Sequence, residues 1–216
     1  MRYPILVAGA AALTLAGCQT LSQNQNAAIG TGIGALVGGV AGHQVNDDNG
    51  RYVGAAVGAL AGGLIGNYMD RQEQQLQQQM QGSGVGVNRV DQGTLQLNIP
   101  SEVLFGVDQS QITQAFYPTL NQIAQTLQQY PNTIVHVYGF TDGSGSEQHN
   151  LQLSQKRAQN AAQYLVAQGV NSQRFVVQGY GERFATAQNN PQERRVEVFI
   201  KAIDEANPQA AYSPVY

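Results

Sequence analysis

Apolar and polar residues alternate along two short stretches in the second half of the chain, residues 85–90 and 94–99. Asp91-Gln92-Gly93 lies between them, and a turn with glycine between two alternating runs predicts a β-hairpin. Val103-Leu104-Phe105 predicts a short extended segment after the hairpin, and Gly179–Glu182 predicts a turn. Runs rich in β-branched and aromatic residues predict further strands at 133–139, 174–178 and 194–200.

Two amphipathic helices are predicted between these strands. The first has apolar residues at helical spacing, namely Ile112, Phe116, Leu120, Ile123 and Leu127. Asp108-Gln109-Ser110 is a signal for its N-terminus, and Pro118 indicates a start or a kink within the run. The second helix runs from Glu147 to Gln168, with Gly169 at its C-terminal end and Arg157 on the flank of its buried face. The residues expected on that buried face are Leu151, Ala158, Ala161, Ala162 and Leu165.

This order of elements predicts one α/β domain over residues 84–202. Two strand–helix–strand crossovers and a hairpin form a two-layer sandwich, with the helices on one face of a mixed sheet. His136 alternates with the apolar side of its strand, so we expect it at the surface. Residues 203–216 contain two prolines and no periodicity, which predicts a disordered tail.

Glycines recur every four residues in two segments near the N-terminus, at 30, 34, 38 and 42 and again at 54, 58, 62 and 66. This spacing places the glycines of each segment on one helical face, and Asn46–Gly50 between the segments is a turn signal. Glycine disfavours helices in water but allows close helix packing in membranes, so residues 27–66 predict a helical hairpin in or on a membrane. A flexible low-complexity linker is the alternative.

Shorter segments flank this hairpin. Residues 1–17 form a short apolar run that ends in small residues, as a secretory signal peptide does. Residues 18–26 are polar and predict a tether. Residues 67–83 predict a solvated spacer helix, although a stripe of Met69, Leu76 and Met80 leaves a self-association seam as an alternative.

Charge and motif content exclude several classes of function. The net charge is −3 and only 12% of residues are charged, so nothing indicates a nucleic-acid partner. His43, His136 and His149 lack the spacing of a metal site, and no nucleophile motif is present. We therefore expect neither catalysis, nor a metal, nor a cofactor.

One stretch of strand, glycine loop and helix has the strongest signature, residues 137–158. Its Gly139-Phe140-Thr141-Asp142, Gly145, Asn150, Leu153-Ser154 and Arg157-Ala158 resemble the signature of OmpA-like, peptidoglycan-binding domains. The resemblance implies the OmpA-C-like sandwich, of βαβαββ type, and a pocket for the diaminopimelate of peptidoglycan.

The resemblance also implies roles for individual residues. Asp142 would accept from the ligand ammonium, and Arg157 would hold its carboxylate with two parallel donors. Backbone N–H groups of Thr141–Gly143 would take a second carboxylate, while Asn150 and Leu153 would shape the rim. Arg195 matches the arginine pair of the family's last strand and is expected as a rim charge. Phe140 and Glu193 depart from the family pattern, which has His or Tyr and Asn there.

The N-terminal segments carry two further resemblances. Leu15-Ala16-Gly17-Cys18 resembles the bacterial lipobox, which implies acylation of Cys18, and Gln19 implies sorting to the outer membrane. Residues 27–66 resemble the glycine-zipper module found beside OmpA-like domains. Together these features predict a lipid-anchored outer-membrane protein whose periplasmic domain tethers the membrane to peptidoglycan. The alternatives are an oligomerising structural membrane protein and an accessory of outer-membrane assembly.

Overall fold

The computed structural model describes residues 59–216, so the expected signal peptide, Cys18, the tether and most of the glycine segment lie outside the described residues. The elements in chain order are α3 (Gly62–Gln79), β1 (Gly86–Asp91), β2 (Thr94–Pro100), α4 (Ser101–Leu104), η1 (Gln114–Phe116), α5 (Tyr117–Gln129), β3 (Thr133–Phe140), α6 (Glu147–Ala167), η2 (Ser172–Arg174), β4 (Phe175–Gly181), β5 (Arg195–Ala202) and η3 (Pro208–Tyr212). Within this range no helix combines the length and apolar composition that crossing a membrane requires.

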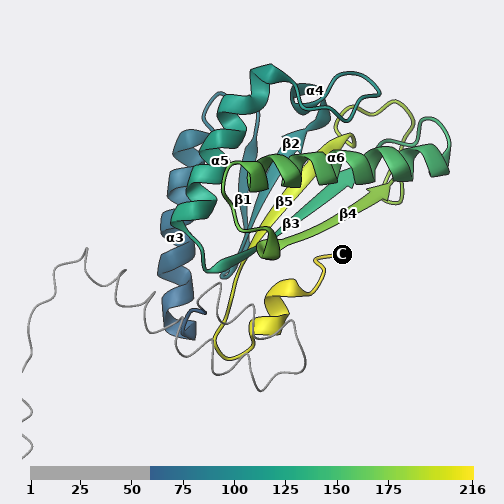
Figure 1. The fold of residues 1–216 in the computed structure, drawn as a ribbon. Helices are drawn as coiled ribbons and strands as arrows, with labels where there is room; N and C mark the ends of the chain where they lie inside the picture. The colour runs from purple at the N-terminus through teal and green to yellow at the C-terminus, as the bar shows by residue number, and fades with distance from the viewer. Residues whose placement is uncertain (1–58) are drawn as a thin grey trace, which may run out of the picture.

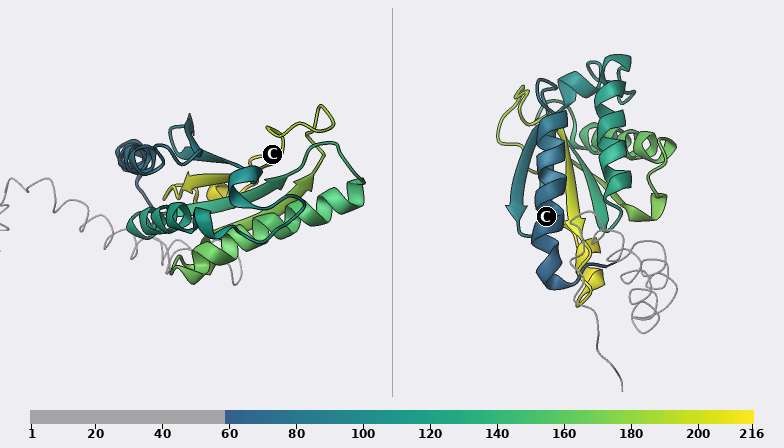
Figure 2. Two further views of the ribbon diagram at one scale, coloured as in Figure 1. Left: turned by 90° about the horizontal axis from the view of Figure 1, so that it is seen from above. Right: turned by 90° about the vertical axis from the view of Figure 1, so that its left-hand side faces the viewer.

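The five strands form one mixed sheet in the order β1-β2-β5-β3-β4 (Figure 1). β3 and β4 are parallel and joined through α6, whereas the β1–β2, β2–β5 and β3–β5 pairs are antiparallel. α5 and α6 pack on one face of this sheet (Figure 2). The predicted α/β sandwich with a mixed sheet is therefore confirmed.

Four local expectations were wrong. Leu151, expected on the buried face of α6, is 49% exposed. Pro118 does mark a helix start, one of its two expected alternatives: α5 begins at Tyr117 with Pro118 in its first turn, where proline fits because no intrahelical partner is needed there. Asp108 thus lies in a loop, not at a helix start. Residues 101–104 form a helical turn instead of an extended segment, and β4 continues to Gly181 where a turn was expected.

Both faces of β3 are covered, since all eight of its residues are buried. Val135 and Val137 belong to the core under the helices. Ile134, Tyr138 and Phe140 belong to two clusters on the opposite face. The central strand therefore needs a cover on each side.

Two glycines allow α6 to lie unusually close to the sheet. A Cβ at Gly139 on β3 would overlap Ser154 O, and one at Gly179 on β4 would overlap the backbone of Gln155. The N–H groups of Gly179 and Gly181 donate to the side chains of Gln155 (2.6 Å) and Ser154 (2.8 Å), which protects part of this edge strand. These contacts fix the position of α6 over the end of β3.

The expected solvated spacer is wrong, because α3 packs on the domain. Met69, Leu76 and Met80 are buried in the main core, and Arg89 of β1 pairs with Asp70 (3.0 Å) and Glu73 (3.1 Å). α3 also begins at Gly62, so the boundary expected at residue 66 falls inside one continuous helix. The apolar stripe, visible among the glutamines, makes α3 part of the folded domain.

The expected disordered tail is also wrong. Residues 203–216 cross the face of the sheet opposite α6 (Figure 2), where Ala211 is buried and Tyr216 packs among Tyr138, Phe140 and Phe199. Lys201 Nζ donates to Ala210 O and Ser213 O, both at 2.9 Å. We call this segment the C-terminal strap. Isolated apolar residues stabilise it without any periodicity.

His136 lies fully buried beneath the strap, not at the surface. Its Nε2 is 2.7 Å from Ala211 O, which can only accept, so Nε2 carries the proton and donates. Nδ1 then accepts from the Tyr138 hydroxyl at 2.8 Å. Burial lowers the pKa of His136, the Lys201 charge lowers it further, and the Ala211 hydrogen bond opposes both.

Candidate functional site

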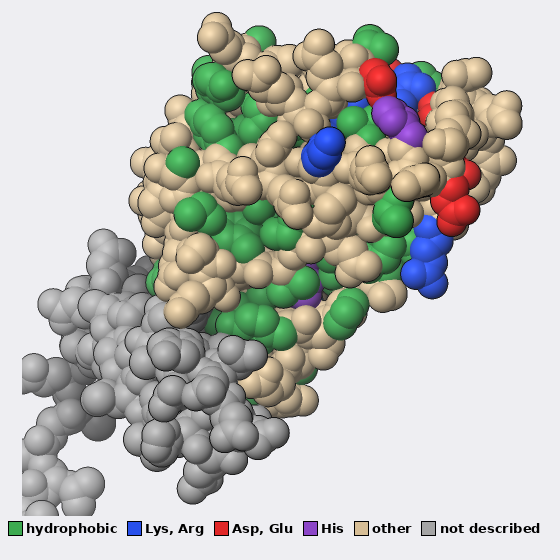
Figure 3. Space-filling view, turned by 45° about the vertical axis from the view of Figure 1, so that its right-hand side comes forward, with side chains coloured by type: hydrophobic (Ala, Val, Ile, Leu, Met, Phe, Trp, Pro, Cys, Tyr) green, Lys and Arg blue, Asp and Glu red, His purple; other side chains and the backbone are tan. Residues whose placement is uncertain are grey.

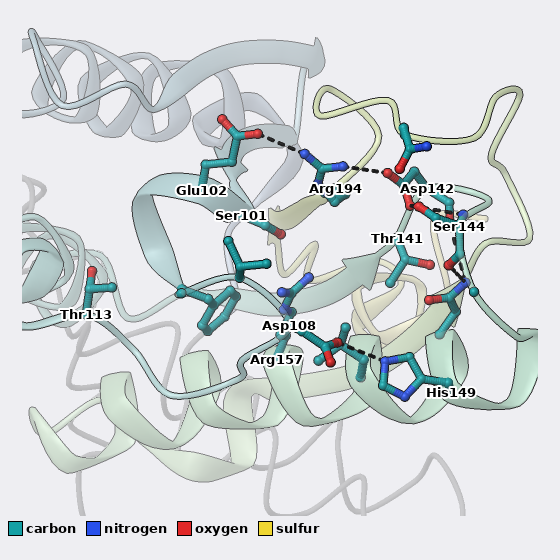
Figure 4. A pocket seen from close by; sticks show the side chains of 17 residues that line it. Ser101, Glu102, Asp108, Thr113, Thr141, Asp142, Ser144, His149, Arg157 and Arg194 are labelled. Carbon is teal, nitrogen blue, oxygen red and sulfur yellow. Dashed lines mark hydrogen bonds and ion pairs between the residues drawn. The ribbon is translucent and has the colours of Figure 1, made fainter.

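A pocket of about 750 Å³ opens where β3 ends (Figure 4). It is bounded by α4, by the loop of residues 106–113, by the glycine loop after β3 and by the first turns of α6. Ligand sites in α/β sheets commonly form beyond the carboxyl ends of strands. In Figure 3 charged side chains and a histidine gather toward one end of a surface that is otherwise largely uncharged.

Asp142 lies in the glycine loop and is only 3% exposed. Ser144 donates to Oδ1 through its hydroxyl and through its backbone N–H (3.1 Å), while Arg194 Nη1 donates to Oδ2 (2.6 Å). Burial would raise the pKa of Asp142, but the hydrogen bonds from Ser144 and Arg194 hold it below its ordinary value. Asp142 is therefore a fixed carboxylate in the pocket wall.

Arg194 is a site residue that the sequence analysis did not identify. Its guanidinium bridges Asp142 and Glu102, the latter at 3.0 Å, across the top of the pocket (Figure 4). Burial lowers the pKa of Arg194, but the two carboxylates outweigh it and raise the pKa above its ordinary value. The neighbouring Arg195, expected at the rim, does not line the pocket.

Arg195 lies on the opposite face of the sheet. Its guanidinium sits 4.3 Å from the ring centroid of Phe140, and its Nε donates to the buried Glu197 at 2.6 Å. Side chains alternate along a strand, so neighbouring arginines reach opposite faces. Phe140 points the same way, which means that its departure from the family pattern removes no group from the pocket rim.

Arg157 is 4% exposed and lines the floor of the pocket, although the helical pattern placed it on the flank of α6. Its Nε donates to Gln109 O at 2.8 Å, and its guanidinium lies 5.2 Å from the Phe105 ring centroid. Within residues 59–216 neither terminal nitrogen has a hydrogen-bond partner, so both can still donate. Burial lowers the pKa of Arg157 and the Asp108 carboxylate opposes this shift; an arginine remains cationic at neutral pH.

Two of the three backbone N–H groups expected to bind a second carboxylate are already used within the domain. Thr141 N donates to Gly181 O (2.9 Å) and Gly143 N to Ala187 O (3.0 Å), so neither is free for an anion. Thr141 and Ser101 line the pocket, and their buried hydroxyls have no partner in the described part of the chain. Unpaired buried hydroxyls are uncommon in folded proteins, and beside a pocket they are candidate donors for a polar ligand that reaches them.

Asn150 and Leu153 of α6 both line the pocket, as expected. Asn150 Nδ2 donates to Ser144 O at 2.8 Å and so stabilises the glycine loop, while Leu153 supplies an apolar wall. Glu193 braces a neighbouring loop through Thr186, whose N–H and hydroxyl donate to it at 2.9 and 2.6 Å. These bonds lower its pKa and give this departure from the family pattern a structural role.

Comparison with known proteins identifies the family of this chain. Residues 104–198 match the OmpA family and residues 1–70 match the YMGG-like Gly-zipper. The probable lipoprotein YiaD of Escherichia coli (strain K12) is 36% identical over 215 residues, which cover 93% of this chain and 98% of YiaD. The chain belongs to the same family as YiaD. It combines an OmpA family domain with a glycine zipper, as its signature residues suggested.

Relatives of the domain alone come from other envelope proteins. The peptidoglycan-binding protein ArfA of Mycobacterium tuberculosis (strain ATCC 25618 / H37Rv) is 36% identical over 103 residues, 45% of this chain and 32% of ArfA. The structure of the cell wall anchor of the T6SS from Pseudomonas aeruginosa is 26% identical, with a TM-score of 0.54, and covers 61% of this chain and 97% of its own. The OmpA-like fold is thus shown by sequence and by structure.

Proposed function

We propose that this protein binds peptidoglycan non-covalently through the diaminopimelate of its stem peptide. The observation that carries the proposal is Arg157, whose two terminal nitrogens face a pocket beside the fixed carboxylate of Asp142. Diaminopimelate ends in a carbon that carries both an ammonium and a carboxylate. A guanidinium and a carboxylate in one pocket match that pair of charges.

Each end of the ligand has a defined partner in this proposal. The ligand carboxylate accepts two parallel hydrogen bonds from Arg157, and Thr141 and Ser101 add neutral donors. The ligand ammonium donates to Asp142, which keeps spare acceptor capacity because a carboxylate has about four lone-pair sites. Arg194 holds Asp142 in place from behind. The protein performs no chemistry on the ligand, so we propose a binding protein and not an enzyme.

The membrane end of the proposed tether rests on sequence. We propose that Cys18 is acylated, that the lipid and the glycine zipper hold the chain at the outer membrane, and that the domain faces the periplasm. Support comes from the full-length likeness to a probable lipoprotein. Replacing Cys18 with serine should abolish labelling with palmitate, and labelling that persists would contradict lipidation at this residue.

Co-sedimentation with purified cell-wall sacculi tests the binding proposal. The full chain should sediment with diaminopimelate-type sacculi, while Asp142→Ala and Arg157→Ala should each lose most binding. Lys156→Ala is the matched control, since Lys156 is an exposed neighbour of Arg157 on α6 and lies outside the pocket. Unfolding curves for each variant separate lost binding from lost structure. No sedimentation of the parent protein would favour the alternative of an oligomerising membrane protein or an assembly accessory.

A further inference from the structure

The loop of residues 106–113 covers one side of the pocket and is fastened to α6 by polar contacts. Gly106, Val107, Asp108 and Thr113 line the pocket from this loop. Val107 at its tip is 97% exposed, so no apolar packing holds the tip down. Asp108 adopts a positive φ of 53°, which is uncommon for a residue other than glycine. Ile112 packs against the core, and Thr113 bonds Leu104 O (2.9 Å) and Val103 O (3.0 Å), so the end of the loop is anchored. Residues 106–111 can open at low cost compared with the elements beneath them.

Three side chains of α6 hold the loop. His149 Nε2 is 2.9 Å from Asp108 Oδ1 at the mouth of the pocket (Figure 4). Arg157 Nε donates to Gln109 O at 2.8 Å, and Asn160 Nδ2 donates to Ser110 O at 2.7 Å. Asp108 and His149 are each more than half exposed, so water can replace their contact, whereas the Arg157 contact is buried.

We propose that residues 106–111 form a lid over the pocket, and that the contact between Asp108 and His149 is the latch that controls ligand entry and exit. This proposal rests on the proposed function for the identity of the ligand. His149 acts as a positioning residue that holds Asp108 across the mouth of the pocket, which both residues line. Arg157 would couple lid movement to ligand binding, because the same guanidinium bonds the lid backbone and the ligand carboxylate.

The latch makes a kinetic prediction for binding of a diaminopimelate-containing stem tripeptide. His149→Ala should raise the association and dissociation rates together, each by about two- to fivefold, because a solvent-exposed polar contact stabilises the closed lid only modestly. Asp108→Asn tolerates the positive φ and should add no further increase in the His149→Ala background, because the contact is already absent there. Stopped-flow mixing gives both rates.

Asn160→Ala separates lid motion from ligand contact. Asn160 fastens the lid but does not line the pocket, so its removal should raise the dissociation rate although it touches no ligand. Gln159→Ala, an exposed neighbour on the same helix, is the control and should leave both rates unchanged. A dissociation rate unaltered by Asn160→Ala would overturn the lid.

Amide hydrogen exchange in the free protein tests the lid independently of any ligand. Exchange within residues 106–111 should be faster in His149→Ala and in the double variant His149→Ala/Asp108→Asn than in the parent, while exchange in β3 stays unchanged. Equal exchange in all three proteins would refute the latch even if sacculi bind. Loss of affinity in Asp108→Asn with normal binding by His149→Ala would also refute it and make Asp108 a direct ligand contact. A parent protein that binds no tripeptide would count against the proposed function, and the exchange result would still decide the latch.

Discussion

The two faces of the sheet bury polar groups in different ways. On the helix side Asp142, Arg157 and Arg194 surround a hollow, and several of their donors and acceptors remain available. On the strap side His136 and Glu197 are buried with their partners already in place. One face holds polar groups ready for a ligand, while the other uses them to fasten its own chain. Burial of a charged or polar residue therefore does not by itself indicate a binding site; unused hydrogen-bonding capacity beside a cavity does.

The largest expected effect comes from disrupting the packing of α6 on the sheet. Gly139→Ala should destabilise the domain by on the order of 3 kcal/mol or more, because the added Cβ overlaps the backbone of α6 and neither element can move freely. Chemical denaturation measures the change. Gly63→Ala is the control: Gly63 is an exposed position of α3 and its Cβ would meet nothing within 4 Å, so the variant should be neutral or stabilise by up to about 1 kcal/mol. Equal stability of the two variants would contradict the close packing of α6.

Removing the C-terminal strap should lower the stability of the domain without weakening ligand binding. Removal of residues 206–216 should lower the free energy of unfolding by at least about 3 kcal/mol, because it uncovers Tyr138 and Phe199 and removes the buried Ala211. Below its new melting temperature the shortened domain should still bind diaminopimelate-type sacculi. Unchanged stability would restore the interpretation of this segment as a disordered tail.

Arg194 and Arg195 are adjacent in sequence but lie on opposite faces of the sheet, so replacing each in turn tests the comparison of the two faces. Arg194→Ala should weaken ligand affinity more than about tenfold, because Asp142 loses a charged hydrogen bond that holds it in place. Arg195→Ala should leave affinity within about twofold but lower stability by about 1–3 kcal/mol, because Glu197 loses a partner and Phe140 loses its cation. Calorimetry and thermal melting measure the two quantities. A reversed pattern would place the functional face on the strap side.

The smallest expected effect is a pH dependence on the strap side. The folded pKa of His136 lies below its ordinary 6.5, so the unfolded chain takes up the proton first. Its contribution to stability should be complete above pH 6.5 and should decline as the pH falls below that value. Tyr138, Lys201 and Tyr212 are the other titratable groups around it. His136→Gln should flatten the pH profile of unfolding near pH 6, and an unchanged slope would contradict this role of His136.

Local patterns predicted the helix side well. The residues from Gly139 to Arg157 lie in one continuous strand, loop and helix, so their spacing in the sequence determines their relative positions in space. Arg194 and Ser101 join the pocket only through the pairing of distant strands, which no local pattern reveals. His136 was misjudged because alternation predicts a half-buried strand, whereas β3 is central and covered on both faces. The C-terminal strap was not predicted because a few scattered apolar residues hold it in place, and these residues do not recur at a regular spacing.

Isothermal titration calorimetry with two stem tripeptides, one with diaminopimelate and one with lysine at the third position, tests the central claim most directly. Lysine lacks the terminal carboxylate, so Arg157 would lose a charged hydrogen bond contributing roughly 1.5–3 kcal/mol. The full chain should bind the diaminopimelate peptide at least about tenfold more tightly. Arg157→Lys should retain only part of that preference, because an ammonium cannot make two parallel hydrogen bonds. Equal affinity of the parent protein for both peptides would contradict the account, even if binding to sacculi survived.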